Sequence, residues 1–74
     1  MKGRTSAKRI GEALRKRRES LGLSQESYAD LIAVHRTYYS GVERGERNLT
    51  MSSMEKVCTG LKVRVWEVLR DADI

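Results

Sequence analysis

The chain has 74 residues and a formal net charge of +5; 39% of its residues are hydrophobic and 34% are charged, with no proline or phenylalanine. This permits one small domain and favours packed helices over a turn-rich β fold. A single cysteine, Cys58, and a single histidine exclude a disulfide framework or a four-ligand zinc site within one chain, and the absence of a long apolar run predicts a cytoplasmic protein with no membrane association.

Basic residues are concentrated at the N-terminus. Residues 1–18 carry eight basic residues and one acidic residue, a net charge of +7, whereas the other 56 residues carry seven basic and nine acidic ones. Such asymmetry is typical of a protein that binds a phosphate-rich partner, although a solvated basic helix face has the same pattern. We expect residues 1–5 to form a flexible basic arm and residues 6–74 to form one domain.

Apolar spacing and end signals predict the first two helices. A helix that starts near Ser6 has inward residues at helical spacing and ends at Gly22. Ser24 is a good N-cap for a second, short helix that ends near Ala33. The inward stripe expected on this second helix is Tyr28, Leu31 and Ile32.

A third helix follows a tight break at Val34 and His35. It carries Tyr39 and Val42 inward and stops at Gly45. Two short helices joined by three or four residues form the helix-turn-helix pattern.

Two further helices complete the predicted all-α, five-helix bundle. Thr50 can cap a fourth helix, whose expected inward residues are Met51, Met54, Cys58 and Leu61. A brief apolar fifth helix follows, and a chain this short cannot cover all of its hydrophobic residues. We therefore expect this helix to dimerise, with an interface formed by Val63, Val65, Trp66 and Leu69.

From Leu23 the segment LSQESYADLIAVHRTYYSGVERGERN resembles the helix-turn-helix of the Cro and phage-repressor family, with lambda-repressor-like features over about residues 10–69. Gln25 follows the capping serine, Ala29 stands where the two helices approach closely, and Glu43-Arg44-Gly45 ends the motif. One departure is Ala33, where the family often has glycine. If this position needs a positive φ, alanine costs about 1 kcal/mol.

The segment HRTYYSGVERGERNLT is similar, more narrowly, to the controller proteins of restriction-modification systems. The resemblance implies a homodimeric transcriptional regulator that binds a pseudo-palindromic DNA operator and controls its own gene and a nuclease gene. Alternatives are a phage or plasmid repressor and the antitoxin of a toxin-antitoxin pair. We expect neither enzymatic activity nor a small-molecule ligand or cofactor, because no catalytic set of residues stands out.

The resemblance places the third helix in the major groove, where its first residues meet base edges. The expected base-reading residues are His35, Arg36, Thr37, Tyr38 and Gly41. Arg36 can donate two hydrogen bonds to one guanine, although an exposed arginine can equally contact a phosphate. The expected phosphate-binding residues are Gln25, Ser40, Arg44, Arg47 and Asn48, of which the last two can also belong to a solvated loop.

Two further features concern charged residues. The family carries an arginine at the position of Arg18 paired with the glutamate that corresponds to Glu43, which implies a structural ion pair. Glu26 and Asp30 are four residues apart on one face of the second helix, and the resemblance makes them a candidate contact with RNA polymerase. The alternative is that Glu26 complements the helix N-terminus and Asp30 is solvated.

Overall fold

The computed structural model describes residues 5–74, which form five α-helices and one 3-10 helix and contain no strand. The elements are, in chain order, α1 (Ser6–Ser20), α2 (Gln25–Leu31), α3 (Arg36–Glu43), α4 (Met51–Cys58), the 3-10 helix η1 (Thr59–Leu61) and α5 (Val65–Asp71). The predicted all-α fold is therefore confirmed. Among the described residues, no helix is both long enough and apolar enough to cross a membrane.

Local capping interactions determine where the helices begin. The side chains of Thr5, Ser24 and Thr50 each accept a hydrogen bond from the backbone N–H three residues later, as expected of N-caps. Gly22 and Gly45 follow the ends of α1 and α3 with φ values of 74° and 75°. Of the predicted basic arm, residues 1–4 lie outside the described residues, and Thr5 itself caps α1.

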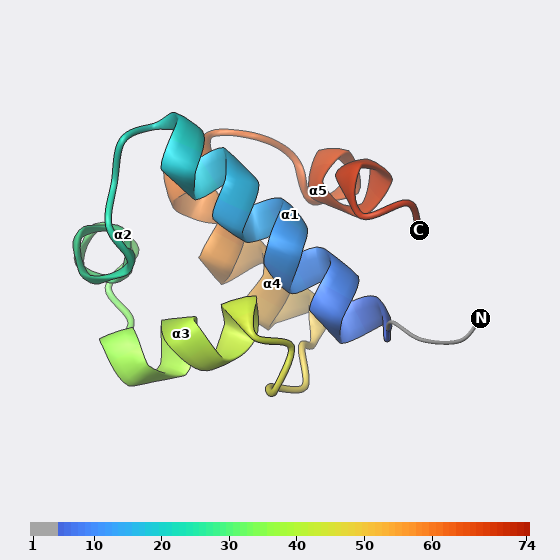
Figure 1. Ribbon diagram of the computed structural model, residues 1–74, viewed down its shortest axis with the longest axis horizontal. Coiled ribbons are helices and arrows are strands. Elements are labelled where there is room, and N and C mark those ends of the chain that lie inside the picture. The colour runs from blue at the N-terminus through green and yellow to red at the C-terminus, as the bar shows by residue number, and fades with distance from the viewer. Residues whose placement is uncertain (1–4) are drawn as a thin grey trace.

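The long helix α1 organises the bundle (Figure 1). It packs against both α3 and α5, while α2 packs against α3 and α4 against α5. In Figure 1, α3 lies below α1 and α5 lies above it, so α3 stands at one edge of the molecule. This position leaves the outer side of α3 available to a partner.

The core centres on two tyrosines, Tyr28 of α2 and Tyr39 of α3. Their ring centroids lie 5.0 Å apart at an interplanar angle of 51°, a tilted arrangement that aromatic pairs favour. The Tyr28 hydroxyl donates a 2.6 Å hydrogen bond to the Val57 carbonyl, and burial raises the pKa of Tyr28 to about 12. Tyr39 and Val42 face inward as predicted.

Two predicted core residues are exposed instead. Leu31 is 60% exposed and Met51 is 63% exposed, whereas Ala29 of α2 and Val57 of α4 are fully buried. Both exposed residues lie at the end of a short helix, where the direction of the core depends on the neighbouring helices rather than on spacing. Their prediction as inward residues was wrong.

A close approach between α1 and α3 depends on Gly11. A Cβ atom at this position would lie 2.2 Å from the Glu43 carbonyl oxygen, a distance that only a backbone shift could relieve. The contact places the middle of α1 directly against the C-terminal end of α3. This close approach was not predicted from the sequence.

Candidate nucleic-acid interface

The turn between α2 and α3 is tightly built. Ala33 adopts φ = 60°, and the Val34 N–H donates a 3.0 Å hydrogen bond to the Ala29 carbonyl. Alanine in this left-handed conformation costs about 1 kcal/mol, which the packing of the two helices offsets. His35 then begins α3 as an N-cap without a side-chain hydrogen bond, so its ring is not committed to the cap.

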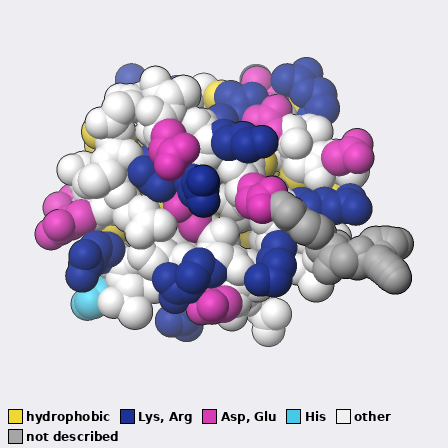
Figure 2. All heavy atoms as spheres, viewed as in Figure 1, with side chains coloured by type: hydrophobic (Ala, Val, Ile, Leu, Met, Phe, Trp, Pro, Cys, Tyr) yellow, Lys and Arg dark blue, Asp and Glu magenta, His cyan; other side chains and the backbone are white. Residues whose placement is uncertain are grey.

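The first turn of α3 presents an exposed polar surface. His35, Arg36 and Thr37 are all exposed, and each of them was expected to read base edges. The inward residues Tyr39 and Val42 hold the opposite side of the helix in the core. In Figure 2, lysine and arginine side chains lie along the edge that α3 and the following loop form.

The structure gives Tyr38 and Gly41 different environments from those expected. Tyr38 is half-buried and packs against the core, and Gly41 is buried. Arg47 lies over both, with its guanidinium carbon 5.4 Å from the Tyr38 ring centroid. Gly41 was expected to read bases, but it is not an open position on the outer side of α3, because the Arg47 side chain covers it.

A buried ion pair anchors the C-terminal end of α3 to α1. The Arg18 Nε donates to Glu43 Oε2 at 2.7 Å and its Nη2 donates to Glu43 Oε1 at 3.1 Å. Arg18 also donates through Nη1 to the Leu23 carbonyl at 2.7 Å. This bidentate geometry fixes both position and orientation, so α3 is tied to α1 and to the start of the helix-turn-helix.

The electrostatics keep both partners of this pair charged. Burial alone would raise the pKa of the Glu43 carboxyl, but the hydrogen bonds from Arg18 and Gln25, together with the nearby Tyr39 hydroxyl, outweigh it and hold this pKa below its ordinary value. The hydrogen bond to Glu43 in turn raises the pKa of Arg18. Burial raises the pKa of the Tyr39 hydroxyl, and the neighbouring carboxylate adds to that effect.

A hydrogen-bond chain connects this buried pair to the surface. The Gln25 Nε2 donates to Glu43 Oε1 at 2.8 Å, and the Ser40 hydroxyl donates to Gln25 Oε1 at 2.8 Å. Both residues were expected to hold phosphates, and both are half-buried here. Because the glutamine amide carries two hydrogens, the chain orients Gln25 and leaves it one further hydrogen to donate.

The loop after α3 supplies the remaining predicted phosphate ligands, Arg44, Arg47 and Asn48, and all three are exposed. The Arg44 Nη2 donates to Glu46 Oε1 at 3.0 Å, an interaction that raises the pKa of Arg44. This ion pair was not predicted from the sequence, although the two residues are only two positions apart. A phosphate at Arg44 would compete with Glu46 for the guanidinium.

Glu26 and Asp30 are both exposed on α2. They lie on the first helix of the helix-turn-helix, beside the one that carries Arg36. Their carboxylates thus belong to the surface around the interface rather than to the core.

Only one of the four expected dimer residues is largely exposed. Trp66 is 56% exposed, and the Arg70 guanidinium carbon lies 5.1 Å from its ring centroid. Val63, Val65 and Leu69 are partly buried against the core. The exposed indole remains an apolar contact surface, whereas these three residues already contribute to the fold of a single chain.

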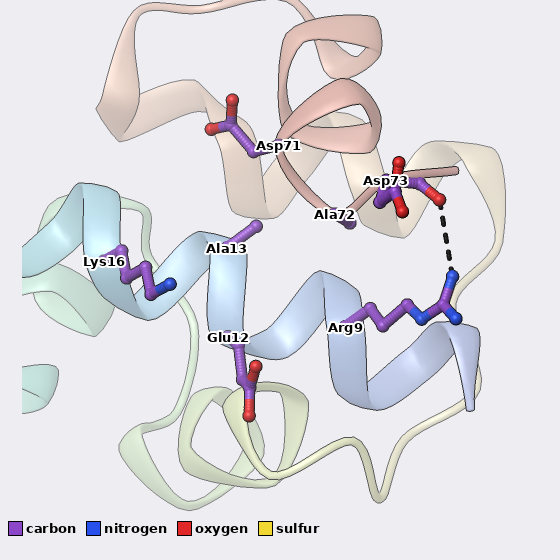
Figure 3. Close-up of a pocket in the computed structure, with 7 residues that line it drawn as sticks. All are labelled: Arg9, Glu12, Ala13, Lys16, Asp71, Ala72 and Asp73. Atoms are coloured by element: carbon purple, nitrogen blue, oxygen red, sulfur yellow. Dashed lines mark hydrogen bonds between the residues drawn. The ribbon is translucent and has the colours of Figure 1, made fainter. Parts of the chain in front are cut away.

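A shallow charged hollow lies on the other side of α1, between α1 and the C-terminal turn (Figure 3). Its lining is Arg9, Glu12, Ala13, Lys16, Asp71, Ala72 and Asp73. The Arg9 Nη1 donates to the Asp73 carbonyl at 3.3 Å, and Asp71 pairs with Arg17. These interactions connect the chain end to α1 and are separate from the surface of α3.

Comparisons with known proteins agree with this geometry. A family model described as helix-turn-helix matches residues 14–65. The control protein C.MunI of Mycoplasma sp is 42% identical over 66 residues, which span 88% of this chain and 89% of that protein.

Solved structures share the whole fold. The clp gene regulator ClgR of C. glutamicum has a TM-score of 0.91 and 28% identity, over 97% of this chain and 92% of that one. The restriction-modification controller protein C.Esp1396I, solved as a tetramer in complex with its natural 35 base-pair operator, has a TM-score of 0.82 and 32% identity, over 97% of this chain and 100% of that one.

Proposed function

The chain belongs to the helix-turn-helix family, and from that membership we propose that it is a transcriptional regulator that binds double-stranded DNA as a homodimer. The observation that carries the proposal is the exposed start of α3, with Arg36 and Thr37 outward and the far end of the helix fixed by the Arg18–Glu43 pair. A rigid helix with free polar side chains at its N-terminal end suits base reading in a major groove. Such a role requires no enzymatic activity and places the protein in the cytoplasm.

Within the family, the controller role has the strongest support. C.MunI is 42% identical over 89% of its own length, whereas ClgR is 28% identical despite its high TM-score. C.Esp1396I is a restriction-modification controller solved on its operator. We therefore assign this chain the control of restriction-modification genes, its own gene included.

The proposed contacts divide into two kinds. Arg36 reads bases together with its neighbours Thr37 and His35. Arg36 can donate to a guanine edge, and Thr37 can contact a thymine methyl group. The loop residues Arg47 and Asn48 hold phosphates and set the register of α3, as do the residues Gln25, Ser40 and Arg44. The first group determines sequence preference, and the second determines overall affinity.

Dimerisation through α5 completes the proposal. A two-fold dimer places two recognition helices roughly 34 Å apart, which matches half-sites about 10 bp apart from centre to centre. Trp66 is the exposed apolar residue on α5. The exposed carboxylates of Glu26 and Asp30 form a surface that can contact a basic patch of RNA polymerase and so favour activation.

Selection of bound duplexes from a random-sequence pool, followed by sedimentation of the complex, tests the proposal. We expect an enriched pseudo-palindrome with this half-site spacing and two chains per duplex. Enrichment of no sequence would overturn the regulator function. A single chain per duplex, with only monomer at high micromolar concentration, would overturn dimerisation.

A further inference from the structure

The side chain of Arg47 lies against α3, although the residue as a whole is exposed. Tyr38 and Gly41 are three residues apart, so they share one face of the helix. The Arg47 guanidinium carbon lies 5.4 Å from the Tyr38 ring centroid. At Gly41, an added Cβ atom would lie 3.1 Å from the Arg47 Nε and 3.3 Å from its Cγ.

The backbone also holds the loop in this place. The Glu46 N–H donates a 2.9 Å hydrogen bond to the Gly41 carbonyl, so the residue just before Arg47 is fixed to the same turn of α3. Gly41 lies within the helix α3 and does not have a positive φ. The absence of a side chain, rather than backbone freedom, is therefore what this position provides.

We propose that Gly41 is a positioning residue for Arg47. The bare backbone of Gly41 and the ring of Tyr38 form a seat, called here the arginine seat, that orders the Arg47 guanidinium before DNA arrives. A long exposed side chain loses rotamer freedom when it binds a phosphate, and one that is already ordered loses less. The seat is a property of the free protein, and its effect on affinity rests on the proposed DNA-binding function.

The arginine seat gives Gly41 a role different from close approach to DNA. In a close-approach role, a larger side chain at Gly41 would collide with the DNA whatever residue stands at position 47. In the seat role, the larger side chain acts only by displacing Arg47. The two roles therefore differ in how Gly41 and Arg47 variants combine.

The experiment is a double-mutant cycle with Gly41→Ala, Gly41→Leu and Arg47→Ala, singly and in combination. Binding is measured by fluorescence anisotropy to a 25 base-pair duplex enriched from a random pool by the wild-type protein, and to a scrambled duplex. We expect Arg47→Ala to weaken both roughly 10-fold, the loss of one charge-assisted hydrogen bond. Gly41→Ala should weaken binding roughly 3-fold and Gly41→Leu roughly 10-fold, because the larger side chain displaces the guanidinium further.

The combined variants decide between the two roles. We expect neither Gly41 substitution to weaken binding further once Arg47 is alanine. A Gly41 effect of equal size in the Arg47→Ala background, or none in either background, would overturn the seat. Thermal melting is the control for folding, because alanine is a better helix former than glycine, so Gly41→Ala should melt no lower than wild type while binding more weakly.

A measurement without DNA keeps the seat testable if the proposed function fails. Protons of the Arg47 side chain that lie over the Tyr38 ring should resonate upfield of random-coil values in the wild-type NMR spectrum, and Gly41→Leu should abolish that shift. Random-coil shifts in the wild type would overturn the seat. Absence of DNA binding by a wild type that shows the upfield shift would overturn the proposed function alone.

Discussion

Glu43→Ala is predicted to destabilise the fold strongly, although Glu43 is a charged residue outside the apolar core. The Glu43 side chain is 2% exposed and accepts hydrogen bonds from Arg18 and Gln25. Its removal leaves the Arg18 guanidinium, itself only 9% exposed, without a counter-charge. It also frees the Gln25 amide and unties α3 from α1.

The size of the effect follows from burial. Removing one partner of a buried ion pair costs about 3–5 kcal/mol, most of it from the stranded charge. For a domain of 60–100 residues, 1 kcal/mol corresponds to about 4–8 °C in melting temperature. Glu43→Ala should therefore lower the melting temperature by about 12–40 °C. Glu43→Gln keeps the shape of the side chain and one acceptor oxygen, so it should lower the melting temperature by less than Glu43→Ala does.

The assay is thermal unfolding by circular dichroism at one fixed protein concentration, because the proposed dimerisation would make the melting temperature depend on concentration. Glu46→Ala is the matched control, since Glu46 also pairs with an arginine but is exposed. It should leave the melting temperature unchanged. If Glu43→Ala melted as close to wild type as Glu46→Ala does, the buried pair would not stabilise the fold and the reasoning would be wrong.

The same carboxylate predicts a dependence of stability on pH. The folded-state pKa of Glu43 is below its ordinary value of 4.5, so its contribution is fully present above that value and is lost as the pH falls through the folded pKa. The wild-type protein should thus lose stability below about pH 4.5, and Glu43→Gln should lose less over the same range. If stability fell equally steeply with falling pH in the two proteins, the Glu43 carboxylate would not be the source of the loss.

Three further predictions concern the surface. Arg36→Ala should cost about 1–3 kcal/mol of binding free energy on the enriched duplex and relax the preference at one base pair per half-site. Arg47→Ala should instead weaken binding to the enriched and scrambled duplexes alike and flatten the salt dependence of binding. If Arg36→Ala weakened binding to both duplexes equally, its base-reading role would be refuted. The double variant Glu26→Gln/Asp30→Asn should keep operator affinity while transcription activation falls, and full activation at saturating occupancy would reject the polymerase contact. Trp66→Glu should shift sedimentation to monomer, and an unchanged dimer would place the interface elsewhere.

Helix ends could be read from the sequence because they depend on local chemistry. Ser24 and Thr50 cap their helices through their own side chains, and Gly22 and Gly45 adopt the positive φ that glycine allows. The positive φ of Ala33, which is 60°, could also be predicted, because this position of the motif often carries glycine. Each of these features involves residues within a few positions of one another.

Features that depend on contacts between helices could not be predicted from the sequence. Helical spacing predicted Leu31 as a core residue, but α2 has only seven residues and its inward direction is set by the elements that pack against it. Gly11 has no distinguishing signal in the sequence, and only the distance from an added Cβ atom to the Glu43 carbonyl oxygen shows that a side chain is excluded there. The arginine seat has the same origin, since the position of Arg47 depends on the path of the loop.

The basic N-terminal region shows how charge in a sequence differs from charge available to a partner. Three arginines of α1 pair with carboxylates of the same chain: Arg15 with Glu19, Arg17 with Asp71 and Arg18 with Glu43. Two of these pairs join α1 to other parts of the bundle, so they contribute to the fold and leave less positive charge for phosphates. In the proposed complex with DNA, attraction to the phosphates would therefore depend more on α3 and the loop that follows it than the net charge of residues 1–18 suggests.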